Sequence, residues 1–186
     1  MIRHFVTDRR RFGLTPDALV AKAAAAVQRG ADVIQVRERD LSDRALLDLV
    51  RRVIDAASGA RVLVNDRTDV ALAAGAAGVH LRGDSPPAAR VRDIVPPGFL
   101  VGRSVHSCAE VDAAIAAGGC DYLMFGTVFV SSGKPAGHPV AGLDGLAEAC
   151  CRSSVPMIAI GGMTPDREAD IARAGAAGLA AVGWFM

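Results

Sequence analysis

The chain has 186 residues, of which 51% are hydrophobic, 22% charged and only 4% aromatic, and its formal net charge is +1. These values are typical of one globular domain (residues 1–186), and the charge gives no electrostatic basis for binding nucleic acid or an anionic membrane. No apolar run approaches the roughly 20 residues that span a bilayer, and no apolar signal core follows Met1, so we expect a cytoplasmic protein. The four cysteines lack zinc-ligand spacing and are too few for a disulfide scaffold; we expect small buried thiols.

Short apolar runs rich in Val, Ile and Leu alternate along the chain with Ala-rich stretches of helical period. The predicted strands are residues 4–7, 33–37, 61–64, 78–81, 99–102, 121–125, 157–160 and 178–182. The predicted helices are residues 16–28, 43–57, 69–74, 87–94, 109–116, 143–151 and 165–174. Thr-Pro pairs mark two helix starts, and four glycines sit where helices end, at Gly30, Gly75, Gly118 and Gly175.

Eight uniformly apolar strands with short connections favour a closed parallel barrel, the TIM (β/α)8 fold of the α/β class, over an open doubly wound sheet. Such barrels usually take about 250 residues, so this one is short. Because the sequence stops at Met186, directly after the eighth strand, we expect most or all of the eighth helix to be missing. Function is then expected on the loops that follow the carboxyl ends of the strands.

The segment after the second strand carries an amide and two guanidinium groups. Period-two alternation sends Gln35, Arg37 and Arg39 to one side and leaves Val36 and Glu38 on the other. Such a set suits an anion with several oxygens, because guanidinium groups bind phosphate bidentately. The alternative is an exposed charged loop.

Two carboxylates follow the third and fourth strands. Asp66 comes directly after Asn65, and Asp84 lies in the next strand's loop. Carboxylates from neighbouring loops, beside an anion-binding set, are what Mg²⁺ requires when it bridges to a diphosphate. Ordinary helix capping is the alternative for both residues.

Three further features point to the same end of the barrel. His106 follows the fifth strand and can move protons near neutral pH, although a hydrogen-bonded structural histidine is the alternative. Residues 126–139 are rich in Gly and Pro and are interpreted as a mobile lid carrying Lys134 rather than a plain surface excursion. Gly161, Gly162 and Gly183 follow strands seven and eight, where this fold often binds phosphate through backbone N–H groups.

The motifs that carry these residues occur in the order found in the thiamine phosphate synthase and thiazole tautomerase family, which the chain resembles along nearly its whole length. They are residues 5–8, 30–39, 64–67, 78–81, 101–106, 121–126, 134, 140–142, 158–164 and 175–178. The resemblance implies a TIM barrel in thiamine biosynthesis that acts on phosphorylated small molecules. Two activities are known in the family.

For the synthase, the resemblance implies Mg²⁺-assisted departure of diphosphate from hydroxymethylpyrimidine diphosphate and attack by the nitrogen of a thiazole phosphate. Asp66 and Asp84 would hold the Mg²⁺. Across the two activities, the candidate catalytic side chains are Arg37, Arg39, Ser104, His106 and Lys134, with His106 implied for the tautomerase. The implied substrate-binding residues are Gln35, Arg37, Arg39, Asn65, Ser104, Ser131, Lys134, Gly142, Gly161, Gly162 and Gly183.

The chain departs from the synthase pattern at three places. Arg39 stands where the synthase usually has Lys, and Gly133 replaces the second threonine of the lid motif. The family's second metal aspartate lies five residues after the fourth-strand histidine, whereas Asp84 lies four after His80. Other motifs, including residues 102–107, look closer to the tautomerase, which moves a proton with a histidine matching His106 and needs no metal.

Synthase is therefore the leading hypothesis and tautomerase the second. A non-catalytic ligand-binding or regulatory relative is the third, motivated by the expected loss of the eighth helix and by the altered lid. An unrelated phosphate-binding barrel isomerase is the weakest alternative, because the motif match is ordered. Exposed surface near the eighth strand would suit a homodimer.

Overall fold

The computed structural model describes residues 1–135 and 137–186. Its strands are β1 (Ile2–Val6), β2 (Val33–Val36), β3 (Arg61–Asn65), β4 (Gly78–Leu81), β5 (Leu100–Val105), β6 (Tyr122–Phe125), β7 (Met157–Ile160) and β8 (Gly178–Ala181). Each strand pairs in parallel with the next, and β1 also pairs with β8, which closes the barrel. The predicted closed barrel is confirmed, and the open sheet is excluded.

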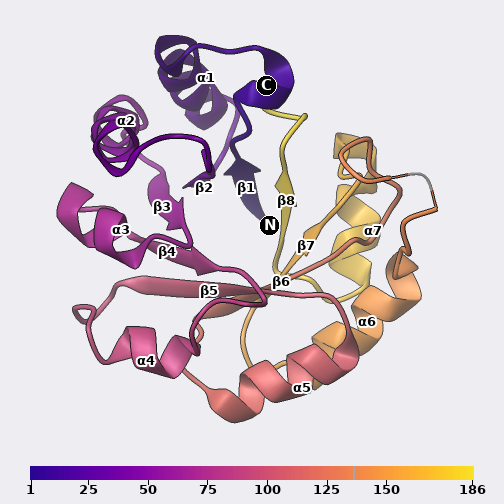
Figure 1. Cartoon of the computed structure of the whole chain (residues 1–186). Helices are drawn as coiled ribbons and strands as arrows, with labels where there is room; N and C mark the ends of the chain where they lie inside the picture. The colour runs from indigo at the N-terminus through magenta and orange to yellow at the C-terminus, as the bar shows by residue number, and fades with distance from the viewer. Residues whose placement is uncertain (136) are drawn as a thin grey trace.

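Helices surround the strands in chain order (Figure 1). They are α1 (Pro16–Gln28), α2 (Asp43–Ala56), α3 (Thr68–Ala74), α4 (Ala88–Arg92), α5 (Cys108–Ala117), α6 (Gly142–Arg152) and α7 (Glu168–Arg173), with two 3-10 turns, η1 (Arg10–Phe12) and η2 (Pro165–Arg167). The first predicted cap is confirmed, since the Thr15 side chain accepts from the Ala18 N–H at 3.2 Å. All four predicted helix-end glycines have positive φ.

Alternate residues of the strands face two different surroundings. One set packs between the strands and the helices, as Ile34, Val64 and Leu179 do. The other set meets inside the ring, where Val6 and Leu63 pack with Tyr122, Met124, Ile158 and Ala180. This double burial explains why the strands read as continuous apolar runs.

Strand β5 is longer than predicted. It runs to Val105 rather than ending at residue 102, so Arg103 and Ser104 pair with Leu123 and Met124 of β6. The two polar residues resembled a loop in sequence, yet each has a partner in the fold. Ser104 bonds to His80 inside the barrel, and Arg103 donates to the carbonyl groups of residues 83, 85 and 86.

The last predicted helix, residues 165–174, is also different. It is divided into η2 and α7, and the Thr164 side chain makes no capping bond. The Arg167 side chain donates to the Gly162 carbonyl instead, which ties η2 to the loop after β7. The segment therefore begins with a tight turn beside that loop.

Within the described residues no helix follows β8, as predicted. The last residues lie beside α1 (Figure 1), and the buried Phe185 ring stands 5.4 Å from that of Phe5 in β1. Arg29 at the end of α1 donates to the Trp184 carbonyl at 2.6 Å. These contacts cover part of the wall that an eighth helix would cover.

Two expectations from composition can be compared with the structure. No helix among the described residues is both long and apolar enough to cross a membrane. The cysteines are free, but the expectation of buried thiols is wrong: three are partly exposed and Cys151 is fully exposed. They lie on helices or their flanks, where small side chains need not be enclosed.

Candidate functional site

A cavity of about 1520 Å³ opens at the carboxyl ends of the strands. Among the described residues its lining contains a single carboxylate, Asp8, against six basic side chains, Arg11, Arg37, Arg39, Arg82, Lys134 and Arg167. The chain as a whole is nearly neutral, so this excess of positive charge is local. A cavity with this lining is suited to a small molecule that carries several negative charges.

The loop after β2 places its side chains as predicted. Gln35, Arg37 and Arg39 line the cavity, whereas the Glu38 side chain is turned away and buried. Glu38 accepts a hydrogen bond from Thr7 Oγ1 at 2.6 Å, and Thr7 Oγ1 accepts one from the Arg37 N–H at 3.0 Å. Thr7 and Glu38 thus anchor the backbone that carries Arg37, a role that the sequence did not reveal.

The guanidinium groups of Arg37 and Arg39 in this loop repel one another. Burial and then the charge of Arg39 lower the pKa of Arg37, although Asp8 acts in the other direction from 3.7 Å. Bringing an anion between the two groups relieves this repulsion. The single carboxylate of Asp8 does not balance the two guanidinium groups, so the pair is suited to an anionic ligand.

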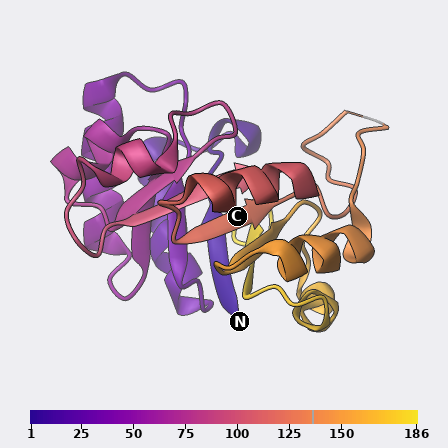
Figure 2. The same ribbon diagram turned by 90° about the horizontal axis from the view of Figure 1, so that it is seen from below.

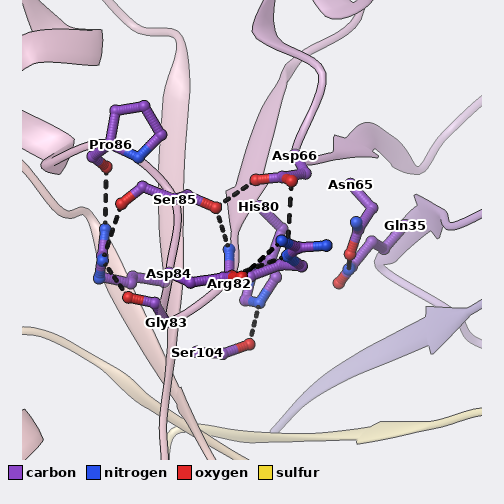
Figure 3. A network of polar contacts seen from close by, with 11 residues as sticks. Gln35, Asn65, Asp66, His80, Arg82, Gly83, Asp84, Ser85, Pro86 and Ser104 are labelled. Atoms are coloured by element: carbon purple, nitrogen blue, oxygen red, sulfur yellow. Dashed lines mark hydrogen bonds and ion pairs between the residues drawn. The ribbon is translucent and has the colours of Figure 1, made fainter. Parts of the chain in front are cut away.

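The floor of the cavity is a buried polar network that sequence reasoning undervalued. His80 bonds through Nδ1 to the Tyr122 hydroxyl at 2.9 Å. Through Nε2 it bonds to Ser104 Oγ at 2.8 Å (Figure 3). Burial lowers the pKa of His80 to about 3. The period-two pattern of β4 is the signal that would have placed His80 inside the barrel.

His4 lies beside this network with its ring 6.5 Å from that of His80. Burial, together with His80, lowers the pKa of His4 to about 3, so both imidazoles are neutral near pH 7. Gln35 donates to Asn65 Oδ1 at 2.9 Å and faces His4 without forming a hydrogen bond of normal geometry. Among the described residues neither His4 Nε2 nor Gln35 Oε1 has a partner, and of the two residues Gln35 lines the cavity, where its Oε1 is left for a ligand or water.

His106 stands at the mouth of the cavity and is exposed. Its Nδ1 lies 2.5 Å from the Gly126 carbonyl oxygen, and its backbone N–H donates to Glu110 at 2.9 Å. Because a carbonyl only accepts, Nδ1 must carry the hydrogen, and Nε2 of the neutral ring is then the acceptor. The arrangement presets one tautomer for proton transfer.

The predicted lid, residues 126–139, projects from the barrel between β6 and α6 (Figure 2), and residue 136 lies outside the described residues. Lys134 and Ser131 both line the cavity. Arg11 of η1 donates to Ser132 Oγ at 2.6 Å, and a Cβ at position 133 would stand 2.9 Å from the Arg11 guanidinium. Arg11 thus occupies space beside Gly133, where the family has threonine.

The base of the lid is fixed to the loop after β7. Val128 N–H donates to the Ile160 carbonyl at 2.9 Å, and Phe129 N–H to the Gly161 carbonyl at 3.1 Å. Arg167 lies over the Phe129 ring at 4.1 Å. The lid and this loop are therefore one connected unit.

Three of the four predicted phosphate-binding glycines reach the cavity, namely Gly161, Gly162 and Gly183. Gly161 has φ +105°, and a Cβ there would lie 2.5 Å from the Thr127 side chain, so the lid's close approach requires glycine. Gly142 does not line the cavity, and its N–H already donates to the Val128 carbonyl at 3.0 Å. The structure thus places Gly142 in lid anchoring instead.

The predicted metal pair has a cation between its carboxylates already (Figure 3). Arg82 donates to both oxygens of Asp84, at 2.9 and 2.7 Å, and its Nε lies 3.5 Å from Asp66 Oδ2. The Ser85 hydroxyl donates to the remaining oxygen of Asp66. All four carboxylate oxygens are therefore engaged by protein donors.

Other observations agree with this arrangement. The residue five positions after His80 is Ser85, and it, not Asp84, contacts Asp66. In the described part of the chain no three His, Cys, Asp or Glu side chains gather as metal ligands. As they are arranged, the carboxylates of Asp66 and Asp84 fit a guanidinium rather than a divalent cation. Mg²⁺ binding by the two residues stays a prediction. Helix capping is wrong for both, because α3 and α4 begin after residues 67 and 87 without a side-chain cap.

A family model and similar sequences found by comparison with known proteins point to the same family. The family model of thiamine monophosphate synthase matches residues 3–184. A thiamine-phosphate synthase of Methanoculleus marisnigri is 45% identical over 172 residues, covering 91% of this chain and 80% of the relative. One of Anaeromyxobacter dehalogenans is 44% identical over 164 residues, covering 88% and 73%.

Solved structures agree. Thiamine phosphate pyrophosphorylase from Pyrococcus furiosus matches with a TM-score of 0.84 at 31% identity, covering 97% of this chain and 85% of that one. A 3-hexulose-6-phosphate synthase, at 19% identity and a TM-score of 0.76 over 98% and 90% of the two chains, shares the fold alone. The chain belongs to the thiamine monophosphate synthase family.

Proposed function

We propose that the protein is a thiamine-phosphate synthase, which joins hydroxymethylpyrimidine diphosphate to a thiazole phosphate and releases diphosphate. The observation that carries the proposal is the division of one cavity into a neutral buried floor and a cationic rim. A flat heteroaromatic ring with a diphosphate tail needs both. The names of the relatives support the same activity.

The roles of the residues follow from their places. Arg37, Arg39 and Lys134 bind the diphosphate at the rim. The floor receives the pyrimidine, with Gln35, Asn65 and Ser104 supplying amide and hydroxyl groups. The phosphate of the thiazole binds near Gly161, Gly162 and Gly183, beneath the lid carrying Ser131.

The reaction requires charge neutralisation more than a base. The C–O bond between the pyrimidine methylene and the diphosphate breaks, and its electron pair leaves with the diphosphate. The thiazole nitrogen then forms a C–N bond to the cationic methylene. Guanidinium and ammonium groups that bind the leaving diphosphate more strongly as its charge grows lower the barrier.

A second candidate, the thiazole tautomerase, is favoured by His106. The bond from Nδ1 to the Gly126 carbonyl leaves Nε2 as the proton acceptor. On this candidate, His106 exchanges a proton with a thiazole carboxylate phosphate and the diphosphate subsite is unused. A non-catalytic relative is supported by no specific contact.

One assay separates the candidates. Purified protein is given hydroxymethylpyrimidine diphosphate and thiazole phosphate, with Mg²⁺ or with chelator, and thiamine phosphate is measured; product in the presence of Mg²⁺ is expected. No product in both conditions would reject the synthase. Isomerisation of the thiazole carboxylate phosphate that survives chelation and is lost in His106→Gln would establish the tautomerase.

A further inference from the structure

We propose that Arg82 supplies the positive charge that the family's metal would supply in this cavity, so that this chain binds a diphosphate group without a divalent cation. The inference deepens the proposed synthase function and rests on it for the identity of the anion. Its basis is the arrangement of Arg82, Ser85 and the two aspartates in Figure 3.

The first argument is which groups face the cavity. Arg82 lines it, whereas neither Asp66 nor Asp84 belongs to the lining. A diphosphate that enters therefore meets the guanidinium rather than either carboxylate.

The second argument is the chemistry at position 85. Five residues after His80 the family resemblance implies a metal-binding aspartate, and this chain has Ser85. A carboxylate there would add negative charge beside Asp66, whereas the hydroxyl donates to Asp66. Ser85 also accepts from the Arg82 N–H at 2.9 Å, so it orders both partners. The loop thus carries a hydroxyl where the resemblance implies an anion, and it holds the cation of Arg82 three residues earlier.

The third argument is geometric. Asp66 has φ +64°, an uncommon conformation for a residue with a side chain, and Ser85 and Arg82 occupy its two oxygens. Arg82 and Arg37 both line the same cavity, so the two guanidinium groups face a shared region. Two such groups converging on one site suit the several oxygens of a diphosphate.

Calorimetry with inorganic pyrophosphate tests the proposal without turnover. We expect the wild-type protein to bind pyrophosphate in EDTA within about threefold of its affinity in Mg²⁺, and Arg82→Gln to weaken binding in EDTA at least about tenfold. Arg44→Gln is the matched control, because Arg44 is exposed on α2 away from the cavity, and its affinity should not change. Wild-type binding only in Mg²⁺, or unchanged metal-free binding by Arg82→Gln, would overturn the proposal.

A converse variant tests it independently. Arg82→Gly combined with Ser85→Asp removes the cation and restores the carboxylate, so pyrophosphate binding should become dependent on Mg²⁺. Metal-independent binding by this variant would contradict the proposal. The wild-type comparison requires no variant, so folding defects do not remove the test. Synthesis of thiamine phosphate together with pyrophosphate binding that needs Mg²⁺ would reject this inference alone, whereas metal-free pyrophosphate binding without synthesis would reject only the synthase.

Discussion

The floor and the rim of the cavity solve opposite problems within one barrel. The floor buries His4, His80 and Tyr122 and keeps them neutral by desolvation. The rim exposes Arg39 and Lys134 to water, where charge costs little. The comparison teaches that the buried floor can recognise a ligand by shape and hydrogen bonding. The exposed rim can recognise it by charge, because water solvates the rim's cations.

The largest effect should come from breaking the rim. Arg37→Ala removes a guanidinium that neutralises the leaving group, so kcat/KM should fall about 100- to 1000-fold. Stability should change by no more than about 0.5 kcal/mol, because the side chain is partly exposed. Arg44→Ala serves as the control in steady-state assays and urea unfolding. A fall of several kcal/mol in the unfolding free energy of Arg37→Ala would contradict the division between rim and floor.

Breaking the floor should mainly cost stability. His80→Ala leaves the hydroxyl groups of Ser104 and Tyr122 without their partner and opens a cavity, so unfolding free energy should fall by about 2–4 kcal/mol. Tyr122→Phe removes one hydroxyl only and should cost about 1 kcal/mol. Urea denaturation measures both. Equal losses in the two variants would mean that the imidazole contributes no more than one hydrogen bond.

The lid can be separated from the rest by Gly161→Ala. The new methyl group meets Thr127 at positive φ, so we expect a cost of about 1–3 kcal/mol and a raised KM for the thiazole phosphate. Gly98→Ala is the matched control, since Gly98 has φ +82° but nothing within 4 Å. An equal KM change in the control would exclude an effect through the lid.

A last prediction concerns the pH dependence of stability, which is spread over several pH units. The folded pKa of His4 is about 3, below the ordinary value of 6.5, so the unfolded chain binds more protons between these limits. Above pH 6.5 the free energy of unfolding does not depend on the protonation of this histidine. Below pH 6.5 it falls with decreasing pH, by at most about 1.4 kcal/mol per pH unit for each such histidine. His4→Phe should flatten the slope measured by urea unfolding at several pH values. An unchanged slope would show that His4 is not responsible.

Sequence reasoning reached the rim more easily than the floor. Arg37 and Arg39 follow a strand at period-two spacing, and local alternation is enough to place them. Ser104 was assigned to a loop, because its polar character hides the fact that β5 continues through it. From sequence alone a polar residue such as Ser104 is predicted to be exposed, because its buried partner, here His80, is not known.

The contacts of Asp66 could not be predicted from the sequence for another reason. Asp84 and Ser85 are neighbours in a tight loop, and no periodicity tells which side chain turns toward Asp66. Arg11 and Arg167 reach the cavity from opposite ends of the chain, and only the closed ring brings them together. Contacts of this kind depend on tertiary structure, whereas the strands and the helix-end glycines depend on local pattern.

The seam between β1 and β8 differs from every other junction in the ring. Ile2 pairs with Gly178, so this contact closes a loop of almost the whole chain, whereas each other pair joins consecutive strands. Its conformational entropy cost is therefore the largest in the barrel. The ion pair between Arg3 and Glu168 and the packing of Phe185 on Phe5 hold the same junction. The final residues thus help to keep the ring closed. Opening it at this junction would separate β1 and β2 from β7 and β8, whose loops line the same cavity.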